Sequence, residues 1–243
     1  MRPAPTKPHR GETATLWLLR LSEVAPEMEL AAERLLGHAE RQRHAGFARP
    51  LRRRQFALAR LLLRLAASQL SGLAPADISC TAEPGRPPRL SLPAAAAPPG
   101  LSLSHSGDWV ACALDLQAPL GLDIEAIDRQ RDVAALGGWA FSPDEAGWLS
   151  RQPDPHAAFY RLWTGKEAWL KLSHARGEPC LLADTRFELD SGEPCCPQAS
   201  WHTFEAAPGL ALSLMGGSAT PALTRLAGDD LPRLLDAWTW PAA

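Results

Sequence analysis

The chain has 243 residues, with 46% hydrophobic content, 21% charged residues and a formal net charge of −2. This content is enough for one large domain or two small ones with a real core, so we expect an ordinary globular protein. A helix needs about 20 apolar residues to cross a bilayer, and no apolar run in the sequence approaches that length, which argues against a membrane protein. The start, MRPAPTKPHRGE, has no apolar h-region after its charges, so we expect no secretory signal and a cytoplasmic location.

The charge is distributed unevenly along the chain. Residues 1–115 hold 15 Lys and Arg against 10 Asp and Glu, while residues 116–243 hold 10 against 17. The asymmetry has two interpretations: an accident of the solvated surface, or a basic half that meets phosphates and an acidic half that holds a cation. The five cysteines include no C-x-x-C pair, so we expect reduced thiols without a metal role.

The first half of the chain predicts a strand, then helices, then a hairpin, after a loose Pro-rich tail at residues 1–12. The apolar run at residues 14–21 suits a buried strand. One or two helices follow at residues 26–47 and a clearer helix at residues 50–72. A hairpin that turns at a Ser-Gly pair is predicted at residues 101–115. The Pro/Gly-rich residues 83–100 form a connection, interrupted by at most a short strand at residues 89–92.

The second half repeats the order of strand, helices and strands. This repetition predicts two similar α+β halves, residues 13–117 and 118–243. The stretch FSPDEAGWL predicts a helix start with Ser142 as N-cap and Glu145 at the third position of a capping box. A strong helix is predicted at residues 155–173. Three segments with strand character follow as a meander: residues 185–190, 200–207 and 210–216.

The segment PLGLDIEAID, residues 119–128, predicts a strand with apolar side chains on one face and acids on the other. Asp123 and Glu125 then point the same way, with stems about 6.5 Å apart at about 3.3 Å of rise per residue. Their like charges repel each other. Either this is an acidic, solvated face, or the pair helps to bind a hard cation such as Mg²⁺, which takes carboxylate oxygens and leaves positions for water and phosphate.

Glu167, on the predicted long helix, can supply a third carboxylate. It lies four residues before Lys171 on the same helical face, which is also the spacing of a common surface salt bridge. Trp163 and Trp169 favour a fixed position for both charged residues, because two tryptophans should anchor the helix in the core.

The basic half contains a candidate anion site. Ser104 and His105 precede a tight turn, where a histidine is either an ordinary loop residue or part of a phosphate-binding corner with the turn amides. The segments RRR, residues 52–54, and GRPPR, residues 85–89, supply cations for a polyanionic ligand, although such runs are usually solvated.

In order and spacing, the motifs GRP, LSLSHSGDWVACAL, PLGLDIE, FSPDEAGWL and FYRLWTGKEAWLK closely resemble the 4'-phosphopantetheinyl transferases of the surfactin-synthetase-activating type. That family's signature is G-(I/V/L)-D-(I/V/L)-E followed some forty residues later by W-x-x-K-E-(A/S)-x-x-K, and here Asp123 and Glu167 are 44 residues apart. The resemblance runs from roughly Leu35 to Leu189. It implies an α+β fold of two similar halves related by pseudo-two-fold symmetry, each a small antiparallel sheet packed with helices.

The resemblance also implies roles for individual residues. Asp123, Glu125 and Glu167 match the family's Mg²⁺ ligands, and Lys171 matches the lysine that contacts the pyrophosphate of coenzyme A. Contacts with the phosphates and the adenine nucleotide of coenzyme A are implied for residues of the basic half: Arg43, Arg54, Arg86, Ser104 and His105. Glu145 matches a further acid near the site.

The implied reaction moves 4'-phosphopantetheine from coenzyme A to a serine of an apo acyl or peptidyl carrier protein and releases 3',5'-ADP. Glu167 or a bound water would take the serine proton, while Mg²⁺ and Lys171 would stabilise charge on the pyrophosphate. We expect the carrier protein to dock on the basic surface near residues 41–54 or on apolar residues around GGWAF. One chain with both halves can build the whole site, so we expect a monomer.

Two other functions stay open. A D-x-E pair with a distant Glu and Lys also occurs in Mg²⁺-dependent nucleases, but nucleic acid favours a basic groove and the half with these acids is acidic. We therefore expect no nucleic-acid partner. The second alternative is a family member that binds coenzyme A or carrier proteins without transfer. The complete set of Asp123, Glu125, Glu167 and Lys171 favours an enzyme.

Overall fold

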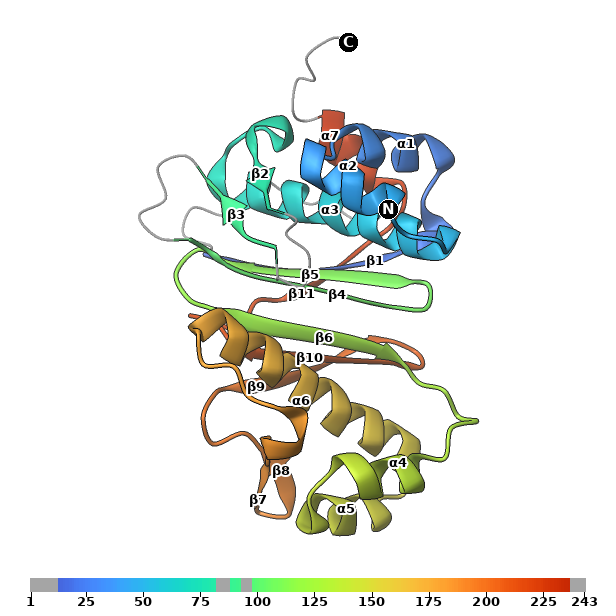
Figure 1. The fold of residues 1–243 in the computed structure, drawn as a ribbon, viewed down its shortest axis with the longest axis vertical. Helices are drawn as coiled ribbons and strands as arrows, with labels where there is room; N and C mark the ends of the chain where they lie inside the picture. Colours follow the sequence, from blue (N-terminus) through green and yellow to red (C-terminus); the bar gives the residue numbers. More distant parts are fainter. Residues whose placement is uncertain (1–12, 82–87, 93–97, 237–243) are drawn as a thin grey trace. The chain divides into compact units, whose positions relative to one another are not determined.

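The structure is a computed structural model that describes residues 13–81, 88–92 and 98–236 (Figure 1). The predicted N-terminal tail and Arg86 lie outside the described residues. Within the described parts of the chain, no helix is both long enough and apolar enough to cross a membrane. All five cysteines are free, as predicted.

The chain divides into two compact units. Residues 1–118 together with 218–243 form the first unit, and residues 119–217 form the second. The first division lies one residue from the predicted boundary, but residues 218–243 cluster with the first unit and not with the predicted second half. The physical reason is strand β11 (Leu223–Leu226), which pairs in parallel with strand β1 (Ala14–Arg20).

The first unit contains a four-stranded sheet in the order β11-β1-β5-β4. Strands β4 (Gly100–Ser106) and β5 (Trp109–Asp115) form the predicted hairpin, and β1 runs antiparallel to β5. The parallel pairing of β11 makes this sheet mixed, whereas we predicted antiparallel sheets. The short strands β2 (Ser79–Cys80) and β3 (Leu90–Ser91) pair with each other as a separate ladder.

Helices cover one face of this sheet (Figure 1). They are α1 (Pro26–Arg34), α2 (His38–Ala45), α3 (Pro50–Ser71) and α7 (Asp230–Asp236). Of the one or two helices predicted at residues 26–47, the structure has two, because the chain turns at residues 35–37 and Gly37 becomes the N-cap of α2. Helix α3 buries its predicted apolar stripe in the core of the unit: Phe56, Leu58, Leu61, Leu62 and Leu65. Two short 3-10 turns complete the unit: Leu21–Glu23 and Pro75–Asp77.

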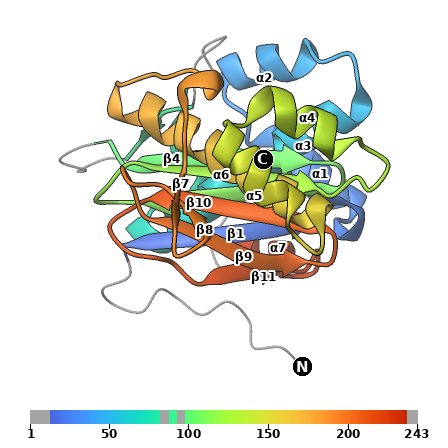
Figure 2. The same cartoon turned by 90° about the horizontal axis from the view of Figure 1, so that it is seen from below.

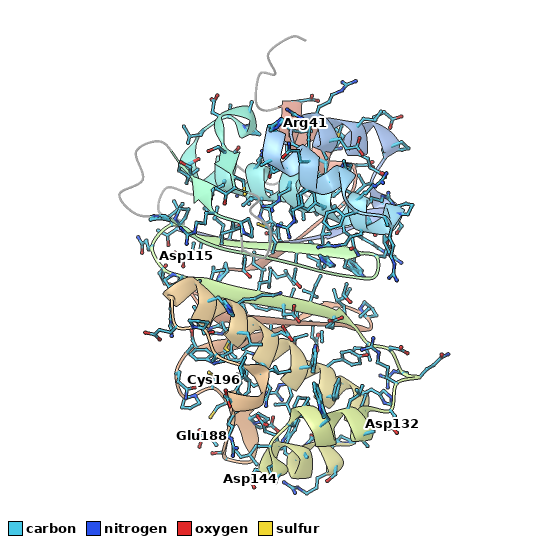
Figure 3. All side chains as sticks on the ribbon, in the orientation of Figure 1. Arg41, Asp115, Asp132, Asp144, Glu188 and Cys196 are labelled. Atoms are coloured by element: carbon cyan, nitrogen blue, oxygen red, sulfur yellow. The ribbon has the colours of Figure 1, made fainter. Side chains whose placement is uncertain are left out.

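Asp115 fixes the end of β5, where the first unit passes into the connection to β6 (Figure 3). Its buried carboxylate accepts hydrogen bonds from the backbone N–H groups of Gln117 (2.8 Å) and Ser218 (2.6 Å). The hydroxyl of Ser218 also donates to it, at 2.8 Å. One side chain therefore holds both segments that link the first unit to the rest of the chain.

The second unit contains a three-stranded antiparallel sheet in the order β6-β10-β9. The strands are β6 (Leu120–Ala126), β9 (Trp201–Ala207) and β10 (Leu210–Gly216). The long helix α6 (Pro155–Arg176) packs against β6 and β10. Helices α4 (Val133–Ala140) and α5 (Pro143–Ser150) pack against α6 (Figure 2).

The predicted meander of three strands is wrong at its first member. Strand β7 (Glu188–Asp190) pairs with β8 (Glu193–Cys195) in a two-stranded hairpin and does not join β9 and β10. The tight turn uses left-handed backbone at Ser191 (φ 51°) and Gly192 (φ 85°), which reverses the chain before it reaches β9. A 3-10 turn at Leu182–Asp184 precedes this hairpin. The remainder of the second unit confirms the predicted α+β class, and the pseudo-two-fold relation between halves stays a prediction.

Candidate active site

The acidic face of β6 lies under helix α6. Gly121 shares this face with Asp123 and Glu125, and a Cβ at Gly121 would lie only 1.9 Å from the backbone oxygen of Ala168. The glycine therefore allows the backbone of α6 to touch the strand two residues before the first acid. This close approach buries Asp123, which we had expected on a polar outer face.

Helix α6 begins and ends with standard caps. The carboxylate of Asp154 accepts a hydrogen bond from the N–H of Ala157 (3.1 Å), and the helix ends at Gly177 with φ 80°. The fully buried anchors of its apolar face are Leu162, Ala168 and Leu172. The predicted anchors, Trp163 and Trp169, are only half-buried and pack at the edge of the core of the second unit.

Lys171 joins the helix to the strand. Its ammonium donates to Oδ1 of Asp123 at 2.7 Å and to the backbone oxygen of Leu122 at 2.8 Å. The Lys171 side chain remains 33% exposed, whereas the Asp123 side chain is nearly buried. The Lys171 ammonium therefore pairs with Asp123 of β6. The spacing in the sequence had also allowed a surface salt bridge between Lys171 and Glu167 on the helix.

Glu167 belongs to the same electrostatic neighbourhood. Burial raises the pKa of the Glu167 carboxyl above its ordinary value, and the negative charge of Asp123 raises it further. The ammonium of Lys171 opposes this increase, and Glu125 adds to it. Asp123 and Glu125 on β6 and Lys171 on α6 therefore all act on the charge of Glu167, and the mutual repulsion of the acids is the property that a bound cation would relieve.

These donors have the chemistry that Mg²⁺ requires. The ion takes oxygen ligands from one or two carboxylates and completes its octahedron with water and substrate phosphate. In the described parts of the chain, no group of three His, Cys, Asp or Glu side chains could hold a metal ion by itself. The Lys171 ammonium occupies the neighbourhood of Asp123 as a substitute positive charge. The residues fit a cation held jointly by protein and phosphate, with Asp123, Glu125 and Glu167 as the candidate ligands.

Glu145 has a second structural role, beyond the predicted capping box, that the sequence did not indicate. It forms the predicted capping box with Ser142, and its Oε2 accepts from the buried ammonium of Lys166 at 2.7 Å. Its Oε1 accepts from the N–H of Phe187 at 2.8 Å, and Lys166 also donates to the backbone oxygen of Thr185 at 2.8 Å. Burial lowers the pKa of Lys166, and Glu145 opposes that decrease. The lysine of the W-x-x-K-E motif is therefore part of a sealed ion pair.

The predicted phosphate corner lies in the hairpin of the first unit. Ser104 is buried and His105 half-buried, and both belong to β4 rather than to the turn, where Gly107 has φ 51°. The turn is held by Asp108, whose carboxylate accepts from the N–H and the hydroxyl of Ser22. The phosphate contacts of Ser104 and His105 stay predictions.

The predicted basic residues of the first unit differ in their surroundings. The guanidinium of Arg54 pairs with Glu29 at 2.5 Å and donates to the backbone oxygen of Leu21 at 2.7 Å, so it braces the start of the unit. Arg43 lies over the ring of Phe56 at 5.9 Å. Burial lowers the pKa of Arg52, and the nearby charge of Arg43 lowers it further, which is the mark of crowded cations that an anion would relieve.

Most of the second unit matches the model of a known protein family. The model of the 4'-phosphopantetheinyl transferase superfamily matches residues 119–206. The chain is 38% identical over 115 residues to a 4'-phosphopantetheinyl transferase of Bacillus subtilis, covering 46% of this chain and 48% of that relative. It is 30% identical over 199 residues to the 4'-phosphopantetheinyl transferase HetI of Nostoc sp., covering 79% of this chain and 82% of HetI. The chain belongs to the 4'-phosphopantetheinyl transferase superfamily.

A further relative, the 4'-phosphopantetheinyl transferase psf-1 of Bacillus pumilus, is 47% identical over 74 residues, which are 30% of each chain. The chain thus spans about half the length of the Bacillus subtilis relative and under a third of the Bacillus pumilus one. The predicted superfamily is confirmed. The surfactin-synthetase-activating type stays a prediction.

Proposed function

We propose that the protein transfers the 4'-phosphopantetheine group of coenzyme A to a serine of an apo acyl or peptidyl carrier protein. The observation that carries the proposal is the gathering of Asp123, Glu125, Glu167 and Lys171 between β6 and α6, inside the residues that match the superfamily. The serine oxygen forms a bond to the β-phosphorus of coenzyme A, the bond from that phosphorus to the bridging oxygen breaks, and 3',5'-ADP leaves.

The chain's own residues divide this work between them. Asp123, Glu125 and Glu167 would hold Mg²⁺, which when bound neutralises charge on the pyrophosphate. Glu167, or a bound water that it orients, would accept the proton of the attacking serine. Lys171 needs only to turn its half-exposed ammonium from Asp123 to the departing phosphate to stabilise its charge.

The coenzyme contacts proposed for the first unit complete this picture of the substrate. Arg43, Arg86, Ser104 and His105 bind the phosphates and the adenine nucleotide. Arg54 is the weakest member of the predicted set, because Glu29 and a backbone oxygen already use its guanidinium. Replacing Arg43 by glutamine should raise the KM for coenzyme A with little change in kcat, because a phosphate contact of this kind binds substrate and transition state alike.

We propose that the carrier protein docks on apolar surface of α4 in the second unit, the second of the two predicted docking surfaces. Trp139, in the GGWAF segment, is 80% exposed there, and Leu136, directly before that segment, is 38% exposed. Large exposed apolar side chains of this kind mark interaction sites. Trp139→Ser should raise the KM for the carrier and leave the KM for coenzyme A unchanged. If the carrier docks instead on the basic surface near residues 41–54, Arg41→Glu and Arg43→Glu should raise the KM for the carrier. We also expect a monomer in the cytoplasm.

Mass spectrometry of an apo carrier protein incubated with this protein, coenzyme A and Mg²⁺ tests the function. A gain of one phosphopantetheinyl group on the carrier, absent with Glu167→Gln, supports the transferase. Coenzyme A binding by calorimetry without any gain on a panel of acyl and peptidyl carriers supports the non-catalytic binder instead. Incubation with plasmid and Mg²⁺ is the matching test for a nuclease, for which digestion is the positive result.

A further inference from the structure

A chain of buried hydrogen bonds connects helix α6 to the sheet directly beside the candidate site. The indole N–H of Trp201 on β9 donates to the hydroxyl of Ser213 on β10 at 3.1 Å. That hydroxyl lies 2.8 Å from the hydroxyl of Thr164 on α6, which in turn lies 2.9 Å from the backbone oxygen of Tyr160. Ser213 and Thr164 are completely buried.

The direction of this chain follows from its two ends. An indole N–H can only donate, and a carbonyl oxygen can only accept. Ser213 therefore accepts from Trp201 and donates to Thr164, which donates to Tyr160. Each hydroxyl has one proton, and in this direction every donor of the chain has an acceptor, although the proton of Thr164 has a second acceptor in the backbone oxygen of Arg161 at 3.2 Å. Removal of the central hydroxyl leaves the indole N–H of Trp201 without its acceptor and the buried Thr164 hydroxyl without the hydrogen bond that it accepts.

The chain lies level with the site acids. Ser213 is the register partner of Asp123 in the pairing of β10 with β6. Thr164 is three residues before Glu167 and seven before Lys171, so all three share one face of α6. One residue beyond Glu167, Ala168 meets Gly121 in the close backbone approach. The helix is thus held at two points, one before and one after Glu167.

The ring of Trp201 holds the first of these two points from the side. Its indole lies against Gly165 of α6, where a Cβ would come within 2.7 Å of the ring, and it packs on Phe187 with ring centroids 4.9 Å apart. The hydrogen bond to Thr164 and the packing of Trp201 against Gly165 therefore hold the same turn of α6. A rotation of α6, or a translation along its axis, would break both contacts together.

We propose that Thr164, Ser213 and Trp201 are positioning residues that hold α6 at the rotation in which Glu167 and Lys171 face Asp123. This inference rests on the proposed function for its kinetic consequence only. Loss of the Ser213 hydroxyl allows this turn of α6 to shift relative to the sheet. A shift of about 1 Å at a reacting group can lower a rate by about 100-fold. We expect Ser213→Ala to lower kcat at least about tenfold, with the KM for coenzyme A within about twofold of the original value.

Two further variants separate positioning from general stability. Thr164→Ser keeps the hydroxyl chain and should retain kcat, whereas Thr164→Val breaks the chain and should behave like Ser213→Ala. Ser173→Ala is the matched control, because Ser173 is a buried hydroxyl of the same helix that donates to the backbone oxygen of Leu170 at 2.9 Å. It should lower the midpoint of thermal unfolding as Ser213→Ala does and leave kcat unchanged.

A second readout does not depend on transfer activity. The NMR signal of the Lys171 side-chain Cε group, assigned with Lys171→Arg, reports the contact of the ammonium with Asp123. In Ser213→Ala or, where that variant does not fold, in Trp201→Phe, this signal should move toward the position of exposed lysines. In Ser173→Ala it should stay in place.

The results decide the inference even where the proposed transferase fails. A protein without transfer activity whose Lys171 signal moves in Ser213→Ala refutes the function and supports the positioning role. An unchanged Lys171 signal in Ser213→Ala and Trp201→Phe overturns the inference. So does a loss of kcat in Ser173→Ala equal to that in Ser213→Ala.

Discussion

Helix α6 carries two lysines, five residues apart, whose ion pairs have the same length and opposite character. Lys166 and Lys171 each lie 2.7 Å from a carboxylate oxygen, of Glu145 and Asp123 respectively. The side chain of Lys166 is 1% exposed, and that of Lys171 is 33% exposed. One pair is sealed in the core, and the other is open to a ligand.

The difference lies in what surrounds each carboxylate. Glu145 accepts from the ammonium of Lys166 and from two backbone N–H groups, and this carboxylate needs nothing more. Asp123 shares its neighbourhood with two further acids, so one lysine faces more negative charge than it can balance. A closed, satisfied pair stabilises a fold, whereas an open pair with excess charge is a place for a cation and a phosphate.

The largest expected effect is on stability at the sealed pair. Lys166→Met leaves the carboxylate of Glu145 buried without its cation, which should lower the free energy of unfolding by about 3–5 kcal/mol in urea titrations. Lys171→Met should change it by less than about 1 kcal/mol, because its pair is partly exposed. Equal losses in the two variants would erase the distinction between the pairs.

A double variant sharpens the first result. Glu145→Gln added to Lys166→Met removes the uncompensated charge, while the amide oxygen of the introduced side chain can still accept from the N–H of Ser142. We expect the double variant to regain a part of the lost stability. A double variant less stable than Lys166→Met alone would mean that charge is not the cause of the loss.

The second effect is on activity at the open site. Glu167→Gln should lower transfer by at least about 100-fold, the range lost with a general base, and leave the protein folded. Glu205→Gln, on the exposed part of β9, is the control and should transfer normally. Near-normal turnover by a folded Glu167→Gln protein would remove Glu167 from the mechanism.

Local sequence patterns predicted the parts of this site but not their contacts. Alternation placed Asp123 and Glu125 on one face of a strand, and the helical period placed Glu167 beside Lys171. The capping box of Ser142 and Glu145 was also predicted correctly, because each of these signals spans only a few residues. The pairs that distinguish the sealed region from the open one join residues 21 and 48 positions apart.

Pairing between strands that are far apart in the sequence could not be predicted from local sequence patterns. The parallel pairing of β11 with β1 joins the two ends of the chain, and neither strand's sequence indicates its partner. The glycine of PLGLDIE did contain a signal, since a glycine inside a strand often marks a close backbone approach. Its meaning became clear only with Ala168 above it.

The third effect tests that close approach. Gly121→Ala places a Cβ against the backbone of Ala168, which cannot move without α6, so we expect a loss of about 1–3 kcal/mol of stability together with reduced transfer. Gly138→Ala is the matched control, because its Cβ would meet nothing within 4 Å, and in a helix this change should stabilise by about 0.5–1 kcal/mol. A Gly121→Ala protein as stable and as active as the original would show that α6 can rise from the sheet without consequence.

The smallest effect is a pH dependence of stability that should occur at the open site and not at the sealed one. The pKa of Glu167 is raised in the folded state above its ordinary value of 4.5, so between these two values the folded protein binds more protons than the unfolded chain. Ionisation of Glu167 therefore lowers stability as the pH rises through this interval, and Glu167→Gln removes that loss. In urea titrations from about pH 4 to about pH 8, the stability advantage of the variant should grow with pH and then level off.

Added Mg²⁺ should reduce the stability difference between Glu167→Gln and the original protein. A cation bound among the acids favours their ionised forms, so it should stabilise the original protein more than Glu167→Gln and reduce the variant's advantage at the upper end of the pH range. Glu205→Gln should show neither the pH trend nor the Mg²⁺ effect relative to the original protein. If the stability advantage of Glu167→Gln is independent of both pH and Mg²⁺, Glu167 is not the acid whose ionisation destabilises the folded protein. The pair of Lys171 and Asp123 would then differ from the pair of Lys166 and Glu145 only in its exposure to solvent.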